Sequence, residues 1–454
     1  MVYGTLYRLH NNIFIVGLLT LGFLTILASS RAFCAITPFT FFSFITQVLL
    51  LLWFSDERRC SYTEKTLFIV VFLYSIFLGG LIIVMSYFFY GGEDFLFEDP
   101  DAVFYYKEGM RTMDLGFVEN SKRIITKFGF DDWGALLFSN FMLSINPSFF
   151  FMNFFYMFIG AVNAVLLLRI GRSFMPDAYA FLASLAYSTA SYIIMFHCTF
   201  LKETYFVFIV VCALYFFNNY IQNGSRGAMM GVILSLVAVV FFRPPLVAFL
   251  LVGIVAYYAV KTRGSAVSIF LYGAIVIGLV GSMAFMQGQM DHYTEGGDSD
   301  ALLAENGSQN YSGGFNYFVA WFVSFFGPFP TLFPLVSLGP KNMNLYGAGL
   351  VHKLFLVLPL WTGIYYAVKR FHVQMIPVVG FTLVEMAATG FIMASFELRK
   401  VLLHVPFTYI IAFYGIYQLE KSEMSAHNKR LLEFAGYALT IGILFLWNVI
   451  RVKG

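Results

Sequence analysis

The chain has little charge for its length. Only 12% of its 454 residues are Asp, Glu, Lys or Arg, whereas a soluble domain usually carries about 25% charged residues. With 59% hydrophobic residues and a mean hydropathy of +0.77, the composition excludes an ordinary soluble domain and predicts an integral membrane protein. The formal net charge of +3 is too small to indicate nucleic-acid binding.

Cysteine and catalytic motifs are scarce as well. The four cysteines lack the spacing of a metal or redox motif, so we expect them to pack as small residues in apolar helices. The sequence has no glycine-rich phosphate loop followed by Lys, no HExxH motif and no Ser/His/Asp order. These absences argue against ATP-driven transport and zinc proteolysis, and we predict no metal site.

Long apolar runs are abundant. Because about 20 apolar residues cross a bilayer, the runs predict an all-α polytopic bundle of about 13 spans, forming one integral membrane domain over residues 1–454. The predicted spans are 12–29, 36–54, 66–90, 149–168, 178–197, 204–220, 228–242, 246–260, 265–286, 350–368, 373–395, 401–419 and 431–450. The apolar stretch 318–336 contains three prolines, which predict a re-entrant segment instead of a further span.

Basic residues in the short loops set the orientation. Thirteen of the 28 basic residues fall in alternate loops, which we place in the cytoplasm: Arg58, Arg59, Lys65, Arg169, Arg172, Arg226, Lys261, Arg263, Lys369, Arg370, Lys421, Lys429 and Arg430. The opposite, outer face then holds two long loops. Loop 91–147 contains ten of the 25 acidic residues and amphipathic helices, and loop 287–348 is polar and Gly-rich before its re-entrant "GPFP" segment.

The stretch "FEDPDAVFYYKEG" (97–109) places three carboxylates at the start of the first outer loop. Asp99 is a suitable N-cap and Pro100 fits the first helical position. One cap does not explain why Glu98 and Asp101 accompany Asp99, because clustered carboxylates repel one another unless a cation or a substrate uses them. We therefore predict a catalytic role for this cluster, next to an amphipathic helix 101–114 that also carries Tyr105.

Several cations run against the positive-inside trend, because they lie at outer helix ends. They occur in "FLKETYF", "FFRPPL" and "SFELRKVLLH", and with their neighbours they form a predicted substrate-binding set: Lys202, Glu203, Arg243, Arg399, Lys400 and His404. Each could instead be a snorkelling helix end, and Lys202 and Glu203 could form a solvated pair. Glu385 lies near the middle of a predicted span. Its predicted role is a proton relay, a partner for a buried base or a hydrogen-bonded structural residue.

The order of these features resembles the GT-C class of integral membrane glycosyltransferases and the related multi-span polymerases of bacterial capsule and O-antigen repeat units. The resemblance covers about residues 90–370 and is carried by "EDPDAVFYY", "FDDWGALLFSNFMLSINPSFFFMNFF", "LLLRIGRSF", "AYAFLASLAYSTASYIIMF", "LKE", "FRPP" and "GPFP" in that order. Two departures are evident. Three predicted spans precede the acidic loop where the simplest members have one, and the large C-terminal periplasmic domain of the family is missing.

The resemblance implies a membrane enzyme that moves a sugar or an oligosaccharide repeat unit from a polyprenyl-(di)phosphate donor to an acceptor hydroxyl of a glycan or lipid-linked acceptor. It implies a bacterial inner membrane, an active site on the periplasmic side and inversion at the anomeric carbon. Asp101, or else Asp99 or Glu98, would be the base, and Lys202, Arg243 and Arg399 would contact the lipid phosphate. The residues demand no cofactor, although a second carboxylate could coordinate magnesium or manganese. A transporter or flippase for lipid-linked sugars is the alternative, and a scaffold without activity is a third interpretation.

Overall fold

The computed structural model describes residues 36–55, 61–89, 100–129, 132–262, 356–370, 372–388 and 402–425, with short pieces between 427 and 442. These described residues contain helices and no strands, which confirms the all-α prediction for this part of the chain. The predicted spans 12–29 and 265–286 and the segment 318–336 lie outside the described residues, as does most of 431–450.

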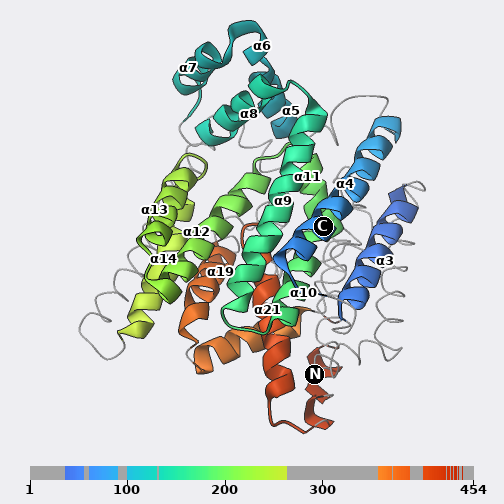
Figure 1. Cartoon of the computed structure of the whole chain (residues 1–454), viewed down its shortest axis with the longest axis vertical. Helices are drawn as coiled ribbons and strands as arrows, with labels where there is room; N and C mark the ends of the chain where they lie inside the picture. The colour runs from blue at the N-terminus through green and yellow to red at the C-terminus, as the bar shows by residue number, and fades with distance from the viewer. Residues whose placement is uncertain are drawn as a thin grey trace, which may run out of the picture.

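The helices follow one another along the chain in the order labelled in Figure 1. In the first half of the chain they are α3 (Ile36–Ser55), α4 (Glu64–Phe89), α5 (Pro100–Met110), α6 (Thr112–Leu115), α7 (Phe117–Lys127), α8 (Trp133–Ile145) and α9 (Phe149–Arg172). The second half contains α10 (Asp177–Ser188), α11 (Ser191–Cys198), α12 (Glu203–Asn223), α13 (Arg226–Val240), α14 (Pro245–Lys261), a helix at 356–369, η3 (Val373–Met375), α19 (Ile376–Ala388) and α21 (Val405–Lys421).

Three of the described helices are long and apolar enough to cross a membrane: Glu64–Val84, Phe149–Arg172 and Glu203–Asn223. The count rises to four if α10 and α11 form one bent span. Several other predicted spans correspond to shorter apolar helices, among them α13, α14 and α19. The described residues therefore support a membrane-spanning helical protein, and the prediction of thirteen spans is not established by them.

Outward-facing apolar side chains fit a lipid environment. On α4, Ile69, Leu73 and Phe77 recur every four residues and are 43%, 59% and 53% exposed. The opposite face of the same helix buries Leu67, Val71 and Leu78. A helix that is apolar on both faces suits a lipid-facing position at the edge of a bundle, because water would penalise its outer face.

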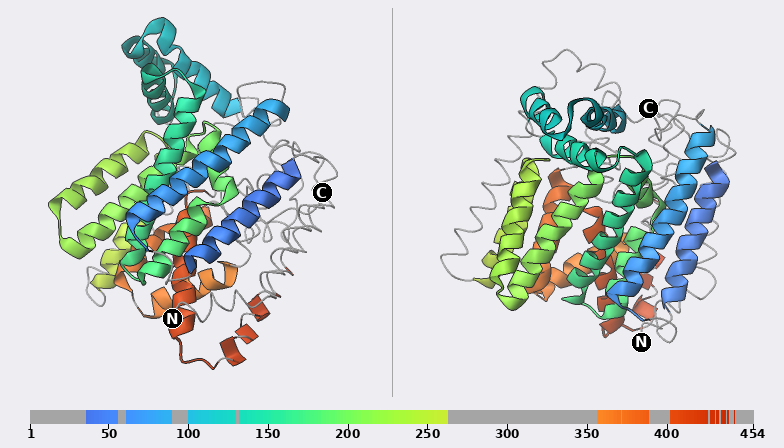
Figure 2. Two further views of the ribbon diagram at one scale, coloured as in Figure 1. Left: turned by 45° about the vertical axis from the view of Figure 1, so that its right-hand side comes forward. Right: turned by 45° about the horizontal axis from the view of Figure 1, so that its top comes forward.

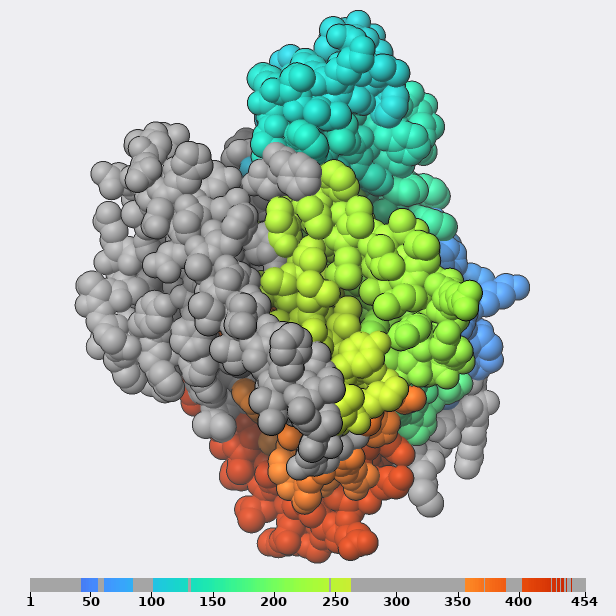
Figure 3. All heavy atoms as spheres, turned by 90° about the vertical axis from the view of Figure 1, so that its left-hand side faces the viewer, coloured from blue at the N-terminus to red at the C-terminus, as the bar shows by residue number. Residues whose placement is uncertain are grey.

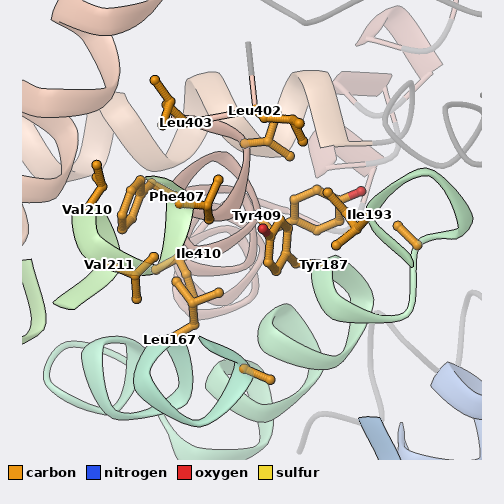
Figure 4. Close-up of a cluster of buried hydrophobic side chains, with 14 of the residues drawn as sticks. Leu167, Tyr187, Ile193, Val210, Val211, Leu402, Leu403, Phe407, Tyr409 and Ile410 are labelled. Atoms are coloured by element: carbon orange, nitrogen blue, oxygen red, sulfur yellow. The ribbon is translucent and has the colours of Figure 1, made fainter. Parts of the chain in front are cut away.

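The core lies around α9, which packs against α4, α10, α11, α12 and α21. Figure 4 shows Leu167 of α9 near Val210 and Val211 of α12 and Ile410 of α21. These four side chains are fully buried. The helix at 356–369 crosses α21 closely, because a Cβ on Gly363 would overlap the carbonyl oxygen of Ile411. Small residues at such crossings let membrane helices approach.

The predicted span 178–197 contains a break. The segment is divided into α10 and α11, which are bent by 53° at Thr189 and Ala190. The Thr189 hydroxyl donates to the Leu185 carbonyl at 2.7 Å, and small hydroxyl residues compete for backbone hydrogen bonds in this way. The side-chain amide of Gln47 on α3 donates to the Ala186 carbonyl at 2.8 Å, so a neighbouring helix satisfies an acceptor at the break.

The first outer loop folds into a helical cap, defined here as α5–α8. Figure 2 shows the cap at one end of the bundle in both views. The basic ends of α4, α9, α13, α14, the helix at 356–369 and α21 lie at the opposite end. That end contains nine of the thirteen basic residues that set the predicted orientation: Lys65, Arg169, Arg172, Arg226, Lys261, Lys369, Arg370, Lys421 and Lys429.

Candidate functional site

The cap is held together by a buried polar network. Glu108 on α5 is only 7% exposed and forms an ion pair with Arg123 of α7. The Asn120 amide donates to the Glu108 carbonyl at 3.0 Å and to the Asn140 side chain at 2.8 Å, which ties α5, α7 and α8 together. Because buried charges need partners, these contacts give Glu108 a structural role.

Two contacts hold α5 in place, one with α8 inside the cap and one with the bundle below. A Cβ on Gly109 of α5 would lie 3.2 Å from the backbone of Ser139 on α8, so the glycine allows the two helices to approach. The Tyr106 ring on the same helix packs edge-on against Phe200, at 5.4 Å between centroids. The cap thus rests directly on the α11–α12 turn.

Lys202 lies at the junction between the cap and the bundle. Its ammonium forms an ion pair with Asp132 at 3.3 Å, and it lies 5.6 Å from the ring centroid of Tyr105 and 5.9 Å from that of Phe206. The Lys202 side chain is 19% exposed, against 36% for Asp132. A cation on aromatic faces beside one carboxylate is partly desolvated yet open to a negatively charged ligand.

The turn before Lys202 has an unusual backbone. Phe200 has φ of 57°, and it is the one described residue other than glycine with positive φ. Its ring is fully buried among Tyr106, Phe149 and Tyr156. A bulky residue in the left-handed region is strained, and such strain persists only where surrounding packing enforces it, often at functional sites. The aromatic contacts therefore fix the turn that presents Lys202.

Glu203 begins α12 directly after Lys202 and is 7% exposed. It lies in the first turn of the helix, where acidic residues are common because the helix dipole is positive there. Two residues further along α12, the Tyr205 hydroxyl accepts a hydrogen bond from the Tyr156 hydroxyl of α9 at 2.9 Å. Both tyrosines are buried, so polar groups continue inward from the junction.

Arg243 reaches the same region from the α13–α14 turn. The Gly134 amide at the start of α8 donates to the Phe241 carbonyl at 2.9 Å, which joins this turn to the cap. The Phe242 ring packs against Phe206 at 5.2 Å between centroids. Arg243 follows directly, is half-buried and makes no ion pair with another described residue. Lys202 thus lies over the Phe206 ring, and Arg243 follows Phe242 in the chain.

Asp101 lies one helical turn before Tyr105 on α5 and is half-buried. Residues four apart share one helix face, with Cβ atoms about 5–6 Å apart. Asp101 is therefore on the face whose Tyr105 ring contacts Lys202. Four other predicted site residues, Glu98, Asp99, Arg399 and Lys400, lie outside the described residues.

His404 requires a correction. It was predicted among the substrate-binding residues of an outer loop, but it is 1% exposed and its Nδ1 forms a hydrogen bond with the Glu385 carboxylate. Glu385 is 2% exposed, so the pair is buried between α19 and the start of α21. This contact fits two of the roles considered for Glu385, a partner for a buried base and a hydrogen-bonded structural residue. His404 is already occupied by Glu385 and is removed from the binding set.

The junction of cap and bundle has six polar residues, of which Tyr105, Asp132 and Lys202 are in contact, whereas the other three are placed there by their position along the chain. The six are Asp101, Tyr105, Asp132, Lys202, Glu203 and Arg243. Asp132 had been counted only as one of ten loop acids; its place before Trp133 in "FDDWG", at the α8 N-cap, is the signal that marks it. Nothing in the sequence marks the left-handed Phe200, because its conformation depends on distant aromatic contacts.

The six residues provide three carboxylates, two cations and one phenol hydroxyl at the junction. Among the residues that the structure describes, no group of three or more His, Cys, Asp or Glu side chains could hold a metal ion. The chain matches no protein-family model and no curated protein sequence.

Proposed function

We propose that the protein is a membrane glycosyltransferase that uses a sugar or oligosaccharide donor linked to polyprenyl phosphate or diphosphate, in the synthesis of a cell-surface polysaccharide or glycolipid. The polysaccharide-polymerase form is the one we favour, at the periplasmic face of a bacterial inner membrane. The observation that carries the proposal is the position of Lys202: a partly desolvated cation at the cap–bundle junction, on the Tyr105 ring, with Asp101 one turn away.

In this proposal the donor enters from the outer leaflet and its phosphate takes the place of Asp132 beside Lys202. Arg243 adds a second cation, and together they stabilise the negative charge that gathers on the departing phosphate. Asp101 accepts the proton of the acceptor hydroxyl as that oxygen attacks the anomeric carbon. The bond from this carbon to the phosphate oxygen breaks in the same displacement, so the configuration inverts.

The test is the variant Asp101→Asn, which keeps the size of the side chain and removes its basicity. We expect the protein to insert and fold, and polymer or glycolipid formation to stop. Asp114→Asn is a matched control, because Asp114 is an exposed carboxylate of α6 in the same cap. Normal product from Asp101→Asn would remove Asp101 as base, and normal product after Glu98, Asp99 and Asp101 are all neutralised would remove the loop from the mechanism.

A flippase for lipid-linked sugars is the second candidate, and the broken α10–α11 helix favours it. Transporters often place substrate at discontinuous helices near the middle of the bilayer. The hydroxyls of Ser188 and Ser191 flank the break, are buried and have no hydrogen-bond partner among the described residues. A flippase would show gradient-linked lipid movement that Glu385→Gln impairs, whereas a glycosyltransferase would show a new glycosidic product that Asp101→Asn abolishes.

A further inference from the structure

Four exposed cations at the end of the bundle opposite the cap share one geometry. Each lies over the ring of the tyrosine four residues earlier in the same helix. The distance from ring centroid to cation is 5.1–5.8 Å. The pairs are Tyr257–Lys261, Tyr365–Lys369, Tyr366–Arg370 and Tyr417–Lys421. We call these four pairs the cation rim.

The rim comes from helices that meet in space. Lys261 ends α14, Lys369 and Arg370 end the helix at 356–369, and Lys421 ends α21. The helix at 356–369 and α21 approach each other at Gly363 and Gly415. Val373, just after Arg370, packs in one cluster with Tyr257 of α14. Figure 3 shows the corresponding orange and red segments at the end of the molecule away from the cap.

The rim cations differ from their neighbours at the same end of the bundle. Arg169 binds Glu64 through two hydrogen bonds, of 2.9 and 2.6 Å, and Arg172 contacts Asp177 at 3.1 Å. Those arginines are neutralised within the protein. The four rim cations make no ion pair with any described carboxylate.

Two described carboxylates adjoin the rim, which is fewer than its four cations. Burial and the nearby Arg370 lower the pKa of His372 below its usual range. Glu420 precedes Lys421 and accepts a hydrogen bond from the Tyr179 hydroxyl. Glu423 is the exposed carboxylate that remains in the described part of this end.

We propose that the cation rim binds the headgroups of anionic glycerophospholipids. Tyrosines at helix ends lie at the membrane–water interface, where lipid phosphates are also found. A ring below each cation holds the charge at that depth, and basic residues beside an anionic leaflet contribute about 1 kcal/mol each. Attraction to helix C-terminal carbonyls explains why cations occur at these helix ends. It does not neutralise the four exposed charges. Lipid phosphates beside the rim would neutralise them.

Native mass spectrometry of the full-length protein tests this inference. Protein purified in a neutral detergent is mixed with equimolar phosphatidylglycerol and phosphatidylcholine of the same acyl chains. We expect the unaltered protein to retain more phosphatidylglycerol, and the fourfold variant Lys261→Gln, Lys369→Gln, Arg370→Gln and Lys421→Gln to lower the ratio of bound lipids at least about fivefold, the effect of one basic residue. The cap variant Lys107→Gln, Lys122→Gln and Lys127→Gln is the control and should keep the ratio.

Equal retention of the two lipids by the unaltered protein would overturn the proposal, as would an unchanged ratio in the fourfold variant. Displacement of phosphatidylglycerol by inorganic phosphate, at an ionic strength matched with chloride, would assign the rim to free phosphate and would also overturn it. If the fourfold variant does not fold, judged by size-exclusion chromatography, Lys369→Gln with Arg370→Gln gives the same comparison on one exposed helix end. None of these outcomes depends on glycosyl transfer.

Discussion

The ammonium of Lys202 lies beside one carboxylate and two aromatic rings. Asp132 neutralises it at 3.3 Å, while the Tyr105 and Phe206 rings reduce its contact with water. A salt bridge that is partly exposed contributes little to stability, so folding alone is a weak reason for this arrangement. In the proposed function this pair exchanges partners, and the donor phosphate replaces Asp132 beside Lys202.

This exchange predicts opposite behaviour for the two partners. Lys202→Gln should lower kcat/KM for the lipid-linked donor roughly 10- to 100-fold, because a charge-assisted hydrogen bond contributes about 1.5–3 kcal/mol. Lys202→Arg should keep most of the activity. Asp132→Asn should leave donor binding unchanged or tighter, since it removes the group that competes with phosphate. Steady-state kinetics with a short-chain donor measure all three, and equal losses in Lys202→Gln and Asp132→Asn would reduce the pair to a structural contact.

Individual residues of the site were predictable to different degrees. Lys202, Glu203 and Arg243 stood out because charge is rare at outer helix ends of a membrane protein. His404 met the same criterion and was wrong, because the sequence could not show that Glu385, 19 positions earlier, would be its buried partner. Asp132 was hidden among other loop acids. Such pairings depend on tertiary packing and leave no local pattern.

At the scale of single helices, apolar run length was an accurate guide. The prediction 204–220 corresponds to α12 at Glu203–Asn223, and 149–168 corresponds to α9 at Phe149–Arg172. At 178–197 it located the apolar segment and not the break, because hydropathy reports that a segment is apolar and not whether its helix is continuous. The acidic loop yielded the expected helix near 101–114, divided into α5 and α6.

The α10–α11 break leads to a prediction about an element. Gln47→Leu removes the amide that donates to the Ala186 carbonyl and leaves this buried acceptor without that partner. We expect destabilisation of about 1–3 kcal/mol, seen as a lower midpoint in thermal unfolding of the purified protein. Gln222→Leu is the control, since Gln222 is exposed at the end of α12. A midpoint that falls equally in both variants would show that the Gln47 contact does not support the break.

For the molecule as a whole, the polar features divide between two ends. The cap and the six-residue site lie at one end, and the cation rim with the Glu64–Arg169 contact lies at the other. Apolar helices of about 20 residues connect them, a length that matches the hydrocarbon thickness of a bilayer. If the positive-inside trend sets the orientation, the rim faces the cytoplasm and the cap faces outward.

The orientation can be tested with single cysteines in a chain whose four native cysteines are replaced by alanine. Glu119→Cys places a thiol on exposed α7 of the cap, and Glu423→Cys places one just beyond α21. In spheroplasts, a membrane-impermeant maleimide should label Glu119→Cys directly and Glu423→Cys only after the membrane is opened, because a charged reagent cannot cross the hydrocarbon core. Labelling of both thiols in intact spheroplasts would place the two ends on the same side. The outer position of the site, and with it the supply of donor from the outer leaflet, would then be wrong.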